Sequence, residues 1–349
     1  MKKINVIRRI GIVFFVLLVG ALTAGYIYQM MSVKKDEKLY KPPGTLYKVG
    51  NKKMHLYEGG SGDATVVFAA GWGTVNPYVD FYPLYGNISK FAKFIVYDKF
   101  GYGYSDTTDK KREIDVIVDE IHEILTVSGQ KPPYIFVGHS LASLEIIRYS
   151  QLYKNEVKGI VLIDGGNPEL YAKTKPITFI STFQRQLINF GIARVLYKTN
   201  GFADYVNSQR NGLRLLPSEL KKLDETATLL KGNNENIIDE MKKSQENAEK
   251  VVNAGKLQDI PLTIITSGDF GNVSKEWLDS QKKMMEWSNN SRQFVVKDSK
   301  HYIHQYHPEC ICQPKIRSKD HLILGHFLVN KCASKICVQR HKYFKLLKI

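Results

Sequence analysis

The sequence predicts an α/β protein with a mostly parallel central sheet flanked by helices. Short apolar runs of strand length alternate along the chain with longer segments of helical periodicity, which is the pattern of a parallel sheet covered on both faces. One of these runs, 134–137, leads directly into the turn Gly138-His139-Ser140-Leu141-Ala142 and then into a helix-like segment. The hydrophobic fraction of 43% and the charged fraction of 24% are those of a folded protein, and 349 residues allow one large domain with an insertion.

The sequence predicts eight strands in the core. A hairpin is expected around Gly50-Asn51, and the later strands are short apolar runs bounded by glycine or aspartate. Helices are expected over 114–127, where isoleucine, valine and leucine fall on one face, over 141–153, and near 274–288. The expected strands cover 46–49, 54–57, 65–70, 94–97, 134–137, 159–163, 262–265 and 293–296.

The segment 167–257 is mostly helical in pattern and contains no β-rich run. Because it is too long for an ordinary crossover, we expect a separate helical lid between the sixth and seventh strands. The core then consists of 45–166 and 258–309. Six apolar residues of the lid are candidates for lining an acyl pocket, although such spacing is more often simple packing of lid on core: Phe179, Phe183, Leu187, Phe190, Ile192 and Leu196.

The net charge of +16 is concentrated at the two ends of the chain. Residues 1–35 carry +6 and residues 310–349 carry +8, which leaves only about +2 for the body between them. The body therefore has no basic surface extensive enough to follow phosphates, and this distribution argues against nucleic-acid binding. All four cysteines also lie in 310–349, so the body needs no disulfides and tolerates either redox compartment.

The N-terminal residues predict a membrane segment. Residues 1–9 are basic, and 10–31 contain no charged residue over a length sufficient to span a bilayer as a helix. The basic residues favour a cytoplasmic N-terminus and an extracytoplasmic body, although three lysines just beyond the span weaken this orientation. A cleaved signal peptide is the competing interpretation, because Val19-Gly20-Ala21 fits a cleavage site, but the apolar run continues about ten residues past it. We expect a single-pass protein of the cell membrane, with a polar linker over 32–44.

The pentapeptide around Ser140 has the form of a nucleophile elbow. In such an elbow a serine lies on a tight turn between a strand and a helix, which pushes its hydroxyl out of the sheet and over the helix N-terminus. Small residues are needed on both sides because the strand and the helix nearly touch there. Gly138 meets this need, and Ala142 is a mild departure from the usual second glycine. Ser140 is therefore the candidate nucleophile.

Four signals occur in order at the ends of the expected strands. They are Gly71-Trp72-Gly73 after the third strand, the segment 98–105 after the fourth, the elbow after the fifth, and His301 after the last. With these signals, residues 45 to about 309 resemble an α/β-hydrolase of the lidded serine esterase or lipase type. In that fold the catalytic triad runs serine, acid, histidine along the chain.

The position of His301 after the last core strand makes it the candidate base that takes the proton of the serine hydroxyl. His304 and His307 are near enough in sequence to be alternatives. His139, inside the elbow, is expected to be a packing residue. Lys300 departs from the small residue that usually precedes the catalytic histidine in this family.

The triad acid has two candidates. Most relatives place it after the strand that follows the lid, where this sequence reads Gly268-Asp269-Phe270-Gly271 and the usual position holds glycine. A minority place it at the end of the strand after the nucleophile helix, where Asp164 lies. Asp164 is preferred and Asp269 is the runner-up. The family also supplies two backbone N–H groups for the oxyanion, which here come from Trp72 and Leu141.

A serine at the elbow implies acyl transfer, because haloalkane dehalogenases and epoxide hydrolases of this superfamily carry aspartate there. The resemblance implies a membrane-anchored serine hydrolase that cleaves an ester of a small or medium acyl substrate, without a metal or an organic cofactor. An amidase or peptidase of the proline-iminopeptidase kind is the enzymatic alternative. The second alternative is a catalytically inactive binding module. It is retained because Ala142 and Gly271 depart from the residues usual in the family.

The tail, 310–349, departs from the family pattern. Relatives usually end with one amphipathic helix, whereas this tail carries four cysteines and nine basic residues against one acid. The two cysteine pairs with two intervening histidines could bind zinc, but their spacings are not those of a common zinc module. A basic tail that binds anionic lipid or a partner is a second interpretation. A frameshifted gene end is the third, and it is the one we favour.

Overall fold

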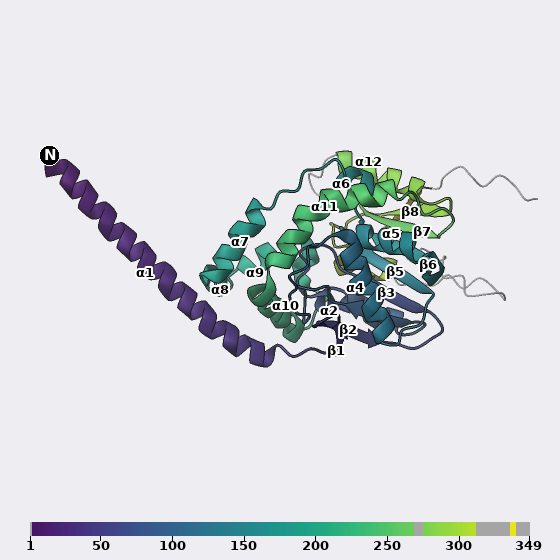
Figure 1. Ribbon diagram of the computed structural model, residues 1–349, viewed down its shortest axis with the longest axis horizontal. Helices are drawn as coiled ribbons and strands as arrows, with labels where there is room; N and C mark the ends of the chain where they lie inside the picture. Colours follow the sequence, from purple (N-terminus) through teal and green to yellow (C-terminus); the bar gives the residue numbers. More distant parts are fainter. Residues whose placement is uncertain (1, 269–274, 312–335, 340–349) are drawn as a thin grey trace, which may run out of the picture.

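The computed structural model describes residues 2–268, 275–311 and 336–339. Within them a single sheet runs in the order β1-β2-β4-β3-β5-β6-β7-β8-β9 (Figure 1). The strands from β3 to β8 are mutually parallel, whereas β1 and β2 at one edge and β9 at the other are antiparallel to their neighbours. Their bounds are β1 Thr45–Val49, β2 Lys52–Gly59, β3 Thr65–Ala69, β4 Lys93–Tyr97, β5 Tyr134–His139, β6 Val157–Ile163, β7 Leu262–Ser267, β8 Ser291–Val296 and β9 Ile336–Gln339.

The mostly parallel sheet predicted from the sequence is confirmed, and each of the eight predicted strands is present. The ninth strand was not predicted. It pairs antiparallel with β8, with Ile336 opposite Val296. A run of four residues inside a basic tail is too short to show the alternation by which a strand is recognised.

Side chains of the central strands point alternately into two hydrophobic cores. Phe136 of β5 packs on the face covered by α4 (Ile114–Val127) and α5 (Ala142–Leu152). Its neighbours Ile135 and Val137 pack on the other face with α3 (Tyr82–Ile88). Because both faces are covered, every residue of β5 is buried, and the strand reads as a continuous apolar run.

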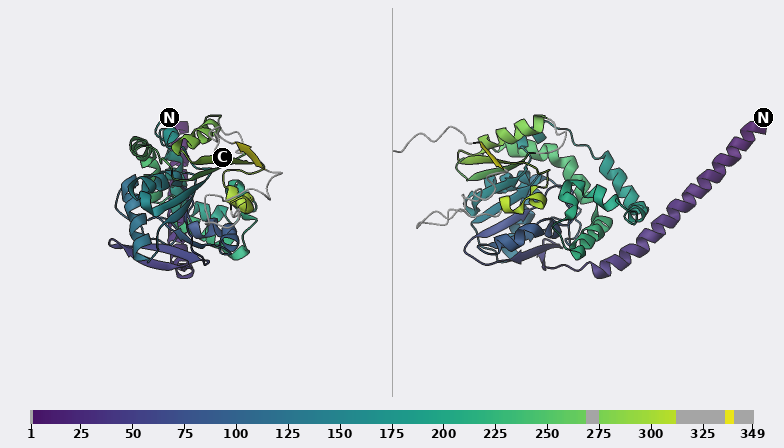
Figure 2. Two further views of the ribbon diagram at one scale, coloured as in Figure 1. Left: turned by 90° about the vertical axis from the view of Figure 1, so that its right-hand side faces the viewer. Right: turned by 180° about the vertical axis from the view of Figure 1, so that it is seen from behind.

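A helical insertion lies between β6 and β7. The insertion consists of α6 (Pro168–Tyr171), α7 (Phe179–Asn189), α8 (Ile192–Leu196), α9 (Phe202–Val206), the 3-10 segment η2 (Ser208–Leu213), α10 (Ser218–Lys231) and α11 (Glu235–Asn253). Figures 1 and 2 show α7 to α10 together at one end of the sheet, the end toward α1 (Lys2–Leu39), while α11 runs from there back over the core. This end of the sheet is the edge where the parallel strands end, which is the edge at which ligand sites form in such sheets.

Helix α1 projects beyond the rest of the molecule (Figure 2). Among the described residues it contains one stretch long and apolar enough to cross a membrane, with a mean hydropathy of 2.4. The helix continues to Leu39, so most of the polar linker predicted over 32–44 is helical instead. The reason is tertiary contact: Asp36 of α1 accepts a hydrogen bond from Arg194 of α8 at 2.7 Å, which fixes this polar stretch against the insertion.

A buried ion network joins the insertion to the core. Lys99, which follows β4, lies 2.8 Å from Glu145 of α5 and 2.6 Å from Glu240 of α11. The hydroxyls of Tyr97 and Tyr102 donate to the two glutamates at 2.6 and 2.7 Å. Burial opposes the charge of the lysine, yet the two facing carboxylates outweigh it and raise the pKa of Lys99 above its usual value.

We predict that Lys99→Met destabilises the protein by about 3–5 kcal/mol, because it leaves two carboxylates buried without their cation. The measurement is the free energy of unfolding in urea. The matched control is Lys158→Met, which removes an exposed lysine on β6 and should change stability by less than about 0.5 kcal/mol. Equal effects of the two substitutions would show that the network does not stabilise the fold.

Candidate active site

Ser140 lies on a sharp turn between β5, which ends at His139, and α5, which begins at Ala142. Its φ angle is 54°, in the left-handed region that residues with a side chain rarely adopt. The turn is bonded to the end of β6, because the backbone N–H of Ser140 donates to the carbonyl of Ile163 at 3.2 Å. The serine therefore has the strained backbone and the strand-to-helix position expected of a nucleophile elbow.

Close packing around the elbow explains its small residues. A Cβ atom added at Gly71 would lie 2.8 Å from the Cβ of Ser140 and 2.9 Å from the carbonyl oxygen of His139, so only glycine fits there. A Cβ added at Gly138 would lie 3.6 Å from the Cβ of Ala142, which is an ordinary contact. Ala142 is the first residue of α5 and fits beside Gly138, so a second glycine is not required.

Asp164 and His301 are brought together across three strands. Asp164 follows β6, is fully buried, and its Oδ2 lies 2.7 Å from Nδ1 of His301. The backbone N–H of Ser267, at the end of β7, donates to the other carboxylate oxygen of Asp164 at 3.1 Å. The hydroxyl of the same serine donates to the carbonyl of Ser299, in the loop that carries His301. Both oxygens of the carboxylate are thus satisfied, and the imidazole is oriented by one of them.

The alternative histidines have other partners. His304 is fully buried, and its Nε2 lies 2.7 Å from Asp80, a carboxylate that also pairs with Arg210 at 3.2 Å. Burial opposes ionisation of Asp80, but His304 and Arg210 outweigh it and hold the pKa of this carboxyl well below its usual range. His307 lies 3.1 Å from Glu309. The sequence analysis missed the pair of Asp80 and His304, because residues 224 positions apart leave no local pattern.

His139 is buried behind the nucleophile, as a packing residue would be. Its ring centroid lies 4.5 Å from that of His301, and its Nε2 is 3.2 Å from the carbonyl oxygen of His301. Burial, reinforced by the neighbouring His301 and His304, lowers the pKa of His139 well below its usual value. A neutral imidazole is therefore favoured at this position.

The two residues predicted to supply oxyanion donors lie on either side of the elbow. Leu141 is the N-terminal flanking residue of α5, where backbone N–H groups have no partner within the helix. Trp72 lies on the loop after β3, directly after Gly71, which contacts Ser140. The indole N–H of Trp72 donates to the carbonyl of Ile237 in α11 at 2.7 Å, and this bond holds the loop against the insertion.

Tyr171, at the end of α6, is a neighbour of Ser140 that the sequence analysis missed. Burial raises the pKa of Tyr171 to about 12, even though a hydrogen bond with the Ser140 side chain acts in the opposite direction. Its ring meets that of Trp277 edge-on at 6.5 Å, and Trp277 in turn meets His301 edge-on at 6.0 Å. A lone tyrosine at the start of a helical insertion carries no motif that would have marked it.

The arrangement agrees with what comparison with known proteins finds. The family model described as "alpha/beta hydrolase fold" matches residues 64–308. This chain belongs to the α/β-hydrolase family. It is 29% identical over 296 residues to the uncharacterized protein YbdG of Bacillus subtilis, covering 82% of this chain and 88% of that protein. It is 25% identical over 278 residues to YqjL of the same organism, covering 79% and 88%.

Solved structures of α/β-hydrolases share the fold at low sequence identity. A putative lipase from Acinetobacter baumannii is 15% identical with a TM-score of 0.60, covering 82% of this chain and 93% of the lipase. The epoxide hydrolase of Bacillus megaterium is 14% identical with a TM-score of 0.58, covering 76% and 96%. The enol-lactonase of Burkholderia xenovorans is 13% identical with a TM-score of 0.57, covering 76% and 95%. These neighbours establish the architecture, and their differing reactions leave the choice of chemistry to the site.

A cavity of about 410 Å³ in this hydrolase lies between the insertion and the site loops. Gly73, next to the predicted oxyanion donor Trp72, and Tyr302, next to His301, form part of its wall. Of the six residues named as acyl-pocket candidates, Leu187 and Leu196 line it. The others do not, and Phe179 and Phe183 are 75% and 56% exposed.

Two predicted features fall on residues outside the described part of the chain. One is the runner-up acid, Asp269, and the other is most of the tail, including Cys312, Cys332 and both histidines of the proposed zinc site. Within the described residues, no group of three or more histidine, cysteine, aspartate or glutamate side chains is arranged to hold a metal ion.

We predict a pH-dependent loss of stability that originates at His139. Its depressed pKa means that the unfolded chain binds a proton below about pH 6.5 while the folded hydrolase does not, so stability falls as the pH drops. Between pH 7 and pH 5, protonation of His139 in the unfolded chain should lower the free energy of unfolding by about 2 kcal/mol. His139→Gln removes this titrating group. Between pH 7 and pH 5, the free energy of unfolding in urea should therefore fall by about 2 kcal/mol less in this variant than in the wild type. Identical losses in variant and wild type would contradict the prediction.

Proposed function

We propose that this protein is a serine hydrolase that cleaves a carboxylic ester through an acyl-enzyme on Ser140. The observation that carries the proposal is the buried carboxylate of Asp164 bonded to His301, together with a serine on the strained elbow after β5. His301 Nδ1 lies 2.7 Å from Asp164, and in the proposal the opposite ring nitrogen, Nε2, acts as the base. The carboxylate also stabilises the imidazolium that forms when the base accepts a proton.

In the proposed mechanism, Nε2 of His301 takes the proton from Ser140 as Oγ attacks the ester carbonyl carbon. The carbonyl oxygen becomes an oxyanion that accepts hydrogen bonds from the backbone N–H groups of Trp72 and Leu141. Collapse of the tetrahedral intermediate breaks the bond to the alcohol, which leaves with the proton from His301. A water molecule then repeats the sequence, releasing the acid and restoring Ser140.

The serine favours ester cleavage over the other reactions represented on this fold. Epoxide opening in this superfamily needs a carboxylate nucleophile that forms an alkyl ester, and this elbow carries a hydroxyl instead. The helical insertion is proposed to act as a lid, and its cavity of about 410 Å³ suits the acyl part of a small or medium ester. Trp72 is proposed to donate its backbone N–H to the oxyanion, while its indole N–H bonds to the carbonyl of Ile237 in α11.

Helix α1 is proposed to anchor the enzyme in the cell membrane as a single span over 10–31. An 18-residue window of this helix has a mean hydropathy of 2.4 and no part of that window is buried, whereas Gln29, near the end of the apolar run, is buried against the insertion. The basic residues before the span favour a cytoplasmic N-terminus, which would leave the catalytic body outside the cytoplasm. The proposed substrate is therefore a small molecule that is met at or beyond the membrane.

We predict that a fluorophosphonate probe labels the detergent-solubilised full chain and that Ser140→Ala abolishes the labelling. The probe reacts efficiently only with a serine activated by a working base and oxyanion donors. The readout is in-gel fluorescence, with circular dichroism to show that both proteins are folded. A folded wild-type protein that takes up no label would overturn the proposal and favour a binding module on the hydrolase fold.

The two acid candidates are separated by matched substitutions. Asp164→Asn should lower kcat on a short-chain nitrophenyl ester by about 10⁴, because the imidazole loses its orienting carboxylate. Asp269→Asn should leave kcat within a few-fold of the wild type. The reverse result would assign the acid to Asp269. A panel that includes a proline amide tests the bond type, and cleavage of the amide alone would replace the esterase by a peptidase.

A further inference from the structure

Large apolar side chains of the insertion are exposed on α7 and α8. On α7, Phe179, Ile180 and Phe183 are 75%, 55% and 56% exposed. Phe183 is four residues from one of them and three from the other, so these side chains share one side of the helix. Exposed apolar surface of this size marks a contact site. We define the α7–α8 surface as Ile177, Phe179, Ile180, Phe183, Ile192 and Val195.

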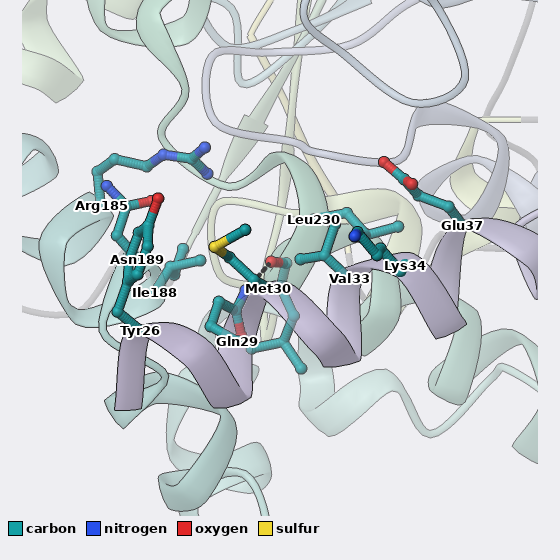
Figure 3. A pocket seen from close by; sticks show the side chains of 11 residues that line it. Tyr26, Gln29, Met30, Val33, Lys34, Glu37, Arg185, Ile188, Asn189 and Leu230 are labelled. Atoms are coloured by element: carbon teal, nitrogen blue, oxygen red, sulfur yellow. Dashed lines mark hydrogen bonds between the residues drawn. The ribbon is translucent and has the colours of Figure 1, made fainter. Parts of the chain in front are cut away.

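The C-terminal half of α1 is bonded directly to the elements that carry this surface. Gln29 donates to the carbonyl of Leu229 in α10 at 3.0 Å and accepts from Arg194 of α8 at 2.8 Å. Figure 3 shows Gln29, Met30 and other α1 side chains directed toward α7 and α10 across a cavity of about 370 Å³. The rings of Tyr26 and Phe190 lie 6.5 Å apart. The insertion is therefore held at a fixed position along α1.

That position lies in the last part of the apolar run, from Gly25 onward. A Cβ added at Gly191, just before α8, would lie 2.7 Å from the carbonyl oxygen of Gly25, so the backbones of α8 and α1 meet there. The uncharged stretch of α1 runs to residue 31, and the first charged residue after it is Lys34. In Figures 1 and 2, α7 leads away from this junction along the side of the body that faces the N-terminal half of α1. A bilayer crossed by that half of α1 would have its surface along α7.

Charge at the edges of this surface favours lipid over a second copy of the chain. Lys175 precedes α7 and is exposed, and Lys198, exposed after α8, donates to the hydroxyl of Tyr28 in α1 at 2.8 Å. Anionic headgroups would attract these lysines. A symmetric contact between two copies would instead bring the same cations toward one another.

We propose that the α7–α8 surface docks on the bilayer that anchors α1, with its apolar side chains among the acyl chains at the headgroup boundary. The inner side of α7 lines the cavity through Leu187 and Ile188, so α7 separates the lipid from the proposed acyl pocket. The inference rests on the anchoring proposed above and deepens it, because it assigns the substrate to esters dissolved in the membrane.

The test uses full-length protein reconstituted in vesicles of phosphatidylcholine and phosphatidylglycerol. Phe183→Trp and Val195→Trp each place a fluorophore on the surface, and phosphatidylcholine with brominated acyl chains quenches tryptophan that enters the lipid. Val127→Trp is the matched control, since Val127 is 47% exposed at the end of α4 nearest the start of β5, opposite the insertion. We expect brominated vesicles to reduce the emission of the first two variants relative to wild type, and to leave the control unchanged.

The outcomes separate the docking from the function on which it rests. Failure of the wild type to float with vesicles would overturn both the anchoring and the docking. If the protein floats but Phe183→Trp and Val195→Trp are quenched no more than Val127→Trp, the anchoring stands and the docking is wrong. Fluorophosphonate labelling of the same samples reports the serine chemistry independently of either result.

Discussion

The close approach of the β5–α5 turn to the loop after β3 is the constraint on which the rest of the site depends. Ser140 adopts a φ angle of 54°, and Gly71 lies so near that no side chain fits there. The strain is offset by hydrogen bonds on both sides, since Ser140 donates to Ile163 and its carbonyl accepts from Gly166. Trp72, the candidate donor, directly follows Gly71 on this loop. One packing constraint therefore positions both the candidate nucleophile and a candidate donor for the oxyanion.

Buried charge holds the insertion over this edge of the sheet. Lys99 joins α5 to α11, and the Tyr102 hydroxyl in the same network lies 3.5 Å from the backbone N–H of Gly73. On the other side, Arg210 of η2 lies between Asp80 and Asp224. Buried ion pairs add little net stability compared with apolar packing, but they are costly to break singly. They therefore tie the insertion to the core, and the cavity between the two is lined by Gly73 and Tyr302, the sequence neighbours of Trp72 and His301.

The sequence predicted the sheet and Ser140 because both depend on local pattern. A strand buried on both faces is recognised as a continuous apolar run in the sequence. An elbow is recognised as small residues around a serine. Tyr171 beside Ser140, and the pair of Asp80 and His304, depend on residues far apart in the chain, so no local pattern marks them. The helical extension of α1 to Leu39 was missed for a related reason, because Arg194 is 158 residues from the Asp36 it stabilises.

The end of β7 shows why an acid after β6 is physically reasonable. A histidine on the loop after β8 must reach across the end of β7 to meet a carboxylate that follows β6. His301 does so, because its Nδ1 lies 2.7 Å from Asp164. Ser267, the last residue of β7, supports both partners through its backbone N–H and its hydroxyl. Through Ser267, β7 thus supplies hydrogen-bond donors to Asp164 and to the loop of His301. A carboxylate on β6 needs this support, because it is fully buried and its second oxygen would otherwise lack a partner.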